Sequence, residues 1–158
     1  MMRKTIAFGI IMLLLIANVV GCSDRSSNNI QPAQNDHSVS QMPFSELSPD
    51  DISSIIVYAI PPDETVTVDD MAQIETIVEI LKTVVIYQKS DEWKKPSGGQ
   101  GVTFTINKAN GNVLIVRPYG QQLIIDGQGY RTEYQPSENL NRIANTVLNT
   151  PFGGEPIE

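Results

Sequence analysis

The chain has 158 residues, of which 41% are hydrophobic, and its 18 acidic residues against 11 Lys and Arg give a formal net charge of −7. A surface this acidic disfavours nucleic acids and anionic lipid headgroups, so we expect neither as a partner. Cys22 is the only Cys in the chain, so intramolecular disulfides are excluded and packing must hold the fold together.

The N-terminal residues have the pattern of a secretory signal. Arg3 and Lys4 form a short basic start, and an apolar run of about a dozen residues follows from Ile6 to Ala17. A membrane-spanning helix needs about 20 apolar residues, and this run is shorter. Residues 1–21 are therefore predicted to be a signal peptide that is removed on export.

Val19-Val20-Gly21-Cys22 resembles the lipobox of bacterial lipoproteins. The resemblance implies a diacylglyceryl group on the Cys22 thiol, cleavage before Cys22, and an extracytoplasmic protein that is lipid-anchored to the bacterial cell membrane. Two acyl chains, at ~0.8 kcal/mol per buried CH₂, anchor a protein stably. Loss of Arg3 and Lys4 with the signal would take the net charge from −7 to −9.

The remaining chain divides into a tether, one domain and a tail. Residues 22–45 are predicted to be the lipidated Cys and a disordered tether, because their polar composition cannot bury enough apolar surface to offset the ordering entropy. Residues 46–150 are predicted to form a single domain, because a length of about 100 residues is common for one domain. Residues 151–158 are predicted to be a disordered tail.

The domain is predicted to open with a β-hairpin. Residues 52–60 are dense in Ile, Val and Tyr, residues 61–64 have turn chemistry, and residues 65–68 alternate as a second strand. Alternation divides the first strand into two faces, with Ile55 and Val57 on one and Ile56, Tyr58 and Ile60 on the other.

Two amphipathic helices are predicted, over residues 71–82 and about 137–148. Asp69 is the predicted N-cap of the first helix, and Asp70 adds negative charge where the helix dipole favours it. Apolar residues recur at helical spacing in both segments: Met71, Ile74, Ile77, Val78 and Leu81, then Leu140, Ile143, Ala144, Val147 and Leu148.

The other segments of the domain are predicted strands and turns. Asn110-Gly111 is a strong hairpin signal, and Pro118-Tyr119-Gly120 and Gly127-Gln128-Gly129 are predicted turns. We predict an α+β fold with the order ββ-α-β-βββ-α, in which two helices pack on one face of an antiparallel sheet of about five to six strands. The strand segments that follow the first helix are residues 83–89, 102–106, 113–117, 122–126 and 130–134.

This element order, with Asp126-Gly127-x-Gly-Tyr130 before the last strand, resembles small uncharacterised lipoproteins of Gram-positive bacteria over roughly residues 50–149. The resemblance implies a fold and a location, and no activity.

No catalytic residue, metal site or cofactor is predicted. His37, the only His, lies in the predicted tether, and the only Cys is predicted to be lipidated, which leaves no Cys/His zinc site and no cysteine nucleophile. The carboxylates around the second strand could offer oxygen ligands to Ca²⁺, but no Asp-x-Asp-x-Asp-Gly loop occurs, so we expect no metal. These carboxylates are Asp63, Glu64, Asp69 and Asp70.

The polar, Gly-rich loop at residues 90–101 carries the only Trp of the chain. Trp93 could be a hot spot for a partner, or it could fold back over the edge of the core, and we favour packing over exposure. Trp93, Lys94 and Lys95 are the candidate partner-binding residues.

We therefore expect a membrane-anchored lipoprotein with a non-enzymatic binding module for an envelope protein or a cell-wall component. The expected binding surface is the 90–101 loop with the sheet face that the helices leave uncovered. One alternative is a cell-wall glycan hydrolase that uses Asp91 or Glu92. Another is an inhibitor or immunity-type lipoprotein whose negative charge steers it to a basic target.

Overall fold

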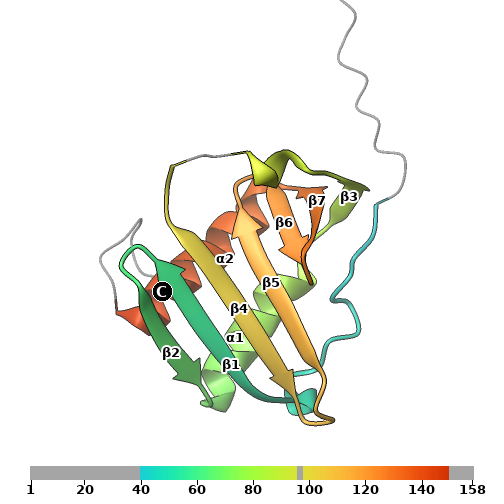
Figure 1. The fold of residues 1–158 in the computed structure, drawn as a ribbon. Helices are drawn as coiled ribbons and strands as arrows, with labels where there is room; N and C mark the ends of the chain where they lie inside the picture. The colour runs from blue at the N-terminus through green and yellow to red at the C-terminus, as the bar shows by residue number, and fades with distance from the viewer. Residues whose placement is uncertain (1–39, 96–97, 150–158) are drawn as a thin grey trace, which may run out of the picture. The chain divides into compact units, whose positions relative to one another are not determined.

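The computed structural model describes residues 40–95 and 98–149, which form a seven-stranded antiparallel sheet with two helices on one face (Figure 1). The predicted α+β class and helix placement are confirmed, but the sheet has seven strands instead of five to six. Cys22, His37 and the tail lie outside the described residues. The strands are β1 (Ile52–Ile60), β2 (Glu64–Val68), β3 (Ile86–Lys89), β4 (Gly101–Lys108), β5 (Val113–Tyr119), β6 (Gln122–Ile125) and β7 (Gln128–Thr132).

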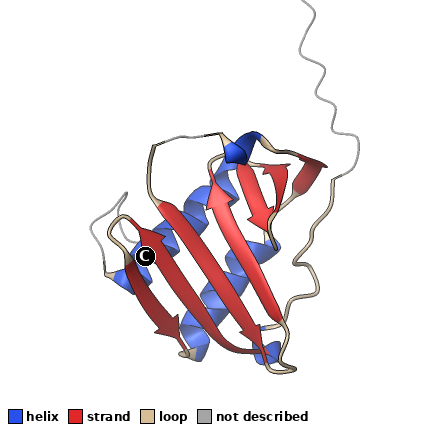
Figure 2. Ribbon diagram, viewed as in Figure 1, coloured by secondary structure: helices blue, strands red, loops and turns tan. Residues whose placement is uncertain are grey.

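The helices are α1 (Met71–Lys82) and α2 (Tyr134–Leu148), and two 3₁₀ turns, η1 (Pro49–Asp51) and η2 (Glu92–Lys94), lie in the connections. The strand order is β2-β1-β4-β5-β6-β7-β3, so α1 carries the chain from one edge strand of the sheet to the other (Figure 2). Neither helix of the described part is long and apolar enough to cross a membrane.

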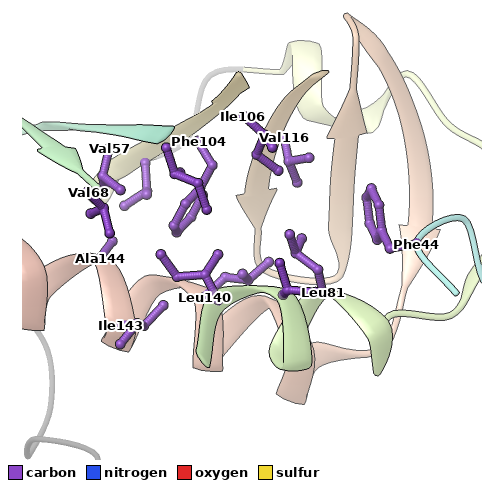
Figure 3. Packing of buried hydrophobic residues seen from close by; sticks show 14 of the residues in the cluster. Phe44, Val57, Val68, Leu81, Phe104, Ile106, Val116, Leu140, Ile143 and Ala144 are labelled. Atoms are coloured by element: carbon purple, nitrogen blue, oxygen red, sulfur yellow. The ribbon is translucent and has the colours of Figure 1, made fainter. Parts of the chain in front are cut away.

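The core lies between the inward faces of the strands and the apolar stripes of the two helices. Ile55 and Val57 of β1 are fully buried, while Ile56 and Tyr58 face the other side, as the alternation predicts. Phe104 of β4 is fully buried and projects from the sheet toward Leu140 of α2 (Figure 3). The buried stripes are Ile74, Ile77, Val78 and Leu81 in α1 and Leu140, Ile143, Ala144 and Leu148 in α2.

Both helices begin at a different residue from the predicted one. The N-cap of α1 is Asp70 and not Asp69, because the Asp70 carboxylate accepts a hydrogen bond from the backbone N–H of Gln73 at 3.0 Å. α2 starts at Tyr134, three residues before Ser137, because Pro136 falls in the first turn, where a missing N–H costs nothing.

Several strand ends also differ from the prediction. β3 covers only the last four residues of the predicted segment 83–89, because Thr83 closes α1 as its C-cap. Pro118 and Tyr119 end β5, although they were predicted as a turn, and Gly129 lies inside β7 and not in the turn before it. Gly127, with a φ of +83°, makes that turn.

The folded part begins before residue 46, the predicted start of the domain. Gln41 pairs with Ile86 of β3 through two backbone hydrogen bonds of 2.9 and 2.8 Å, and the Phe44 side chain is only 3% exposed in the core. Residues predicted as the end of the tether therefore cover the β3 edge of the sheet.

Candidate functional site

Residues 90–95, which we call the strap, lie on the sheet face that the helices leave uncovered. The backbone N–H of Ser90 donates to the carbonyl of Gly129 at 2.9 Å, which fixes the strap to β7. η2 follows and lies at the upper end of β6 and β7 in Figure 1. The long polar loop of the prediction is therefore anchored to the sheet over its first half.

Trp93 packs on Gly129, which answers the question that the sequence left open. A Cβ atom on Gly129 would lie 2.2 Å from the Trp93 ring and 2.4 Å from the Ser90 carbonyl oxygen, so only glycine leaves room for the strap. Gly129 pairs with Ile124 across β6 and β7. Ile124 is only 4% exposed although it lies outside the main core cluster, and Trp93 borders the same hollow as Ile124. The tryptophan thus buries apolar surface on the open face.

Glu92 holds the strap by charge. One of its carboxylate oxygens accepts hydrogen bonds from Arg131 at 3.0 Å and from Gln122 at 3.2 Å, and these two partners face each other across β6 and β7. The hydrogen bond and the charge of Arg131 hold the pKa of Glu92 below its usual value. Glu92 is therefore held as a carboxylate. The general acid of a glycan hydrolase, which protonates a leaving group, needs a raised pKa instead.

We expect acid to loosen the strap. Because the pKa of Glu92 is lowered in the folded state, its contribution to stability is present above the unfolded value of about 4.3 and is lost as the pH falls through the folded value. Trp93 emission, the only tryptophan signal of the chain, should shift to the red as the pH falls through this lowered folded value. Glu92→Gln should remove most of this transition, whereas Glu79→Gln on exposed helix surface should keep it. An unchanged transition in Glu92→Gln would assign it to another group.

A small apolar hollow of about 90 Å³ lies beside Trp93 on the open face. A second, more polar hollow of about 230 Å³ adjoins it, and the two share Pro118 and Tyr119. The other residues that line the apolar hollow are Trp93, Gly101, Val102, Arg117 and Ile124, and the polar hollow is completed by Gly98, Gln100, Gly120 and Asn141.

The cations near the hollow differ in their pairing. Lys94 forms an exposed ion pair with Asp91 at 2.8 Å and lies 5.7 Å from the centre of the Trp93 ring. Lys95 is exposed and lies near enough to Glu92 to favour its charged form. Arg117 is exposed and has no acidic partner in the described part of the chain. Of the predicted site residues, Trp93 lines the hollow, Lys94 lies over the Trp93 ring and is largely exposed, and Lys95 is exposed at the solvent side of the strap.

The charge of the described domain is unevenly distributed. Residues 40–81 contain nine carboxylates and no Lys or Arg. Residues 82–149 contain eight Lys or Arg against five carboxylates, a balance of +3. The strap and β5 belong to this second part, so the hollow lies in the less acidic part of the sequence and suits an anion better than the rest of the domain does.

The carboxylates around β2 have other contacts. Asp63 accepts a hydrogen bond from the Tyr58 hydroxyl at 2.9 Å, which raises the pKa of Tyr58, and Asp70 caps α1. Within residues 40–95 and 98–149, no three His, Cys, Asp or Glu side chains gather as metal ligands.

Sequence reasoning identified Trp93 but missed the residues that complete the hollow. Arg117 and Tyr119 alternate with buried residues along β5. A polar side chain near the end of the outward-facing residues of this strand was the only sign in the sequence that Arg117 and Tyr119 could belong to a site. No sign in the sequence pointed to Gly101 or Gly129, because a glycine in a strand does not reveal which side chain packs on it. In the comparisons with known proteins, no family model, no curated protein and no solved structure matches this chain.

Proposed function

We propose that the chain is a bacterial lipoprotein, anchored through Cys22, whose domain is a non-enzymatic binding module at the cell envelope. The sequence of residues 1–22 supports the location. The apolar hollow beside Trp93, with Arg117 at its lining, supports the binding role, and it is the observation on which that role rests. Ligand sites in proteins typically combine mostly apolar walls with a few convergent polar groups.

The strap gives this site a fixed shape. Three separate contacts hold it: the backbone bond of Ser90 to Gly129, the Glu92 carboxylate on Arg131 and Gln122, and the Trp93 ring on the sheet. A site that is already formed loses less conformational entropy when it binds its ligand. This rigidity supports a binding role more than a role as a spacer.

The binding role can be tested by photocrosslinking in living cells. A photoreactive amino acid in place of Lys95, at the solvent side of the strap, should form defined adducts with an envelope component. The same amino acid in place of Lys82, at the exposed C-terminal end of α1, serves as the control and should form few. Equal adduct patterns at both positions, or none at Lys95, would contradict a binding site at the strap.

A further inference from the structure

We propose that the hollow beside Trp93 binds the carboxyl-terminal residue of a short peptide that ends in alanine, as cell-wall peptides ending in D-alanine do. The choice of wall peptides rests on the proposed function, since it follows from a location outside the cytoplasm. The ligand chemistry itself follows from the size, charge and polarity of the hollow.

The size of the hollow selects a small side chain. A cavity of about 150 Å³ binds benzene, and the apolar hollow has only about 90 Å³. It therefore has room for a methyl or isopropyl group but not for an aromatic ring. Trp93 and Ile124 make its walls apolar, and Gly101 leaves space where another residue would place a side chain. An alanine methyl group meets these limits.

The charge of the site selects a carboxylate. Arg117 lines the hollow and has no acidic partner among the described residues, whereas Arg131, the other arginine near the strap, is paired with Glu92. A guanidinium binds a carboxylate through two parallel hydrogen bonds. A free carboxyl terminus places such a carboxylate one bond from the carbon that carries the small side chain, so both groups can reach the hollow together.

The adjoining polar hollow suits the rest of a peptide. Gln100 and Asn141, which both carry amide side chains, line this hollow. An amide side chain can hydrogen-bond to the polar groups of a peptide backbone. Because Tyr119 borders both hollows, a chain that leaves the apolar hollow past Tyr119 enters the polar one.

The test measures binding of four dipeptides to the full chain, purified in detergent. The probes are N-acetyl-D-Ala-D-Ala, its carboxyl-terminal amide, and the corresponding L,L pair. Binding is followed by the emission of the single Trp and by calorimetry. We expect the D,D free acid to bind, and its amide to bind at least tenfold more weakly. Equal binding of acid and amide, or no binding of any probe at millimolar concentration, would overturn the proposal.

Three variants connect the binding to the hollow. Arg117→Gln removes the charge and should weaken binding of the free acid at least tenfold while leaving the amide unchanged. Gly101→Ala adds a methyl group to a residue that lines the hollow, in ordinary contact with Ile60 at 3.5 and 3.6 Å, and should also weaken binding. Lys82→Gln, an exposed cation at the end of α1, should have no effect. Full affinity in Arg117→Gln would show that the carboxylate is not bound there.

The outcomes also separate this proposal from the proposed function. Preference for the L,L acid would assign the site to protein carboxyl termini and reject wall peptides as the source. Specific crosslinks from position 95 in cells, together with no binding of any dipeptide, would reject the ligand class and leave the binding module in place. Dipeptide binding without such crosslinks would support the ligand chemistry and reject the assignment of its source to the envelope.

Discussion

Gly129→Ala is expected to lift the strap from the sheet and to lower the free energy of unfolding by about 1–3 kcal/mol, the usual cost of extra atoms in a packed site. The new methyl group would lie 2.2 Å from Trp93 and 2.4 Å from the Ser90 carbonyl oxygen, so either β7 or the strap must move. Alanine also restricts the unfolded chain more than glycine does, but this gain is only about 0.4–1 kcal/mol. The steric term is larger, so the net change is destabilising.

Two signals measure this effect separately. Trp93 emission should shift to the red in native buffer, because the ring leaves Ile124 and Gly129 and enters water. Urea unfolding followed by circular dichroism then gives the change in global stability. Gly101→Ala is the matched control, since it is also a strand glycine at the hollow, and a Cβ atom there meets Ile60 only at 3.5 and 3.6 Å. If Gly129→Ala keeps both the emission and the stability of the unmodified chain, Trp93 does not pack on Gly129 in solution.

Cys22→Ala is expected to move the protein from the membrane fraction to the aqueous fraction. The proposed anchor contributes ~0.8 kcal/mol for each buried CH₂ of two acyl chains, which is far more than any exposed ion pair could replace. The acidic chain also offers little attraction to anionic headgroups. Loss of the thiol should therefore remove nearly all membrane association.

Fractionation of cells and labelling with a radioactive fatty acid measure this result. Ser23→Ala is the matched control, because it leaves Val19-Val20-Gly21-Cys22 intact and should stay labelled in the membrane fraction. An unlabelled Cys22→Ala protein that remains in the membrane fraction would contradict the anchor. Normal Trp93 emission in the released protein would show that the domain folds without it.

The candidate site shows where sequence reasoning stopped. The composition of the 90–101 loop singled out Trp93 but left open whether its ring faces solvent or packs, because neighbouring residues in a loop do not fix a side chain's surroundings. Gly129 decides this, and it lies 36 positions further along the chain. Arg117 comes to the hollow from β5 and Gly101 from β4. These residues meet only because β4, β5, β6 and β7 are neighbours in the sheet.

The α+β class, the two helical stripes, the Asn110-Gly111 hairpin and the alternation of β1 could be predicted without the structure, because each depends on side chains within a few residues of one another. The predicted lipid anchor also follows from a contiguous motif. Three features came from the tertiary structure alone: the joining of all seven strand segments into one sheet, the place of β3 at the edge beside β7, and the packing of the strap on the open face. The physical reason is that strand partners and the space above a glycine are set by pairing between distant segments, which local sequence does not encode.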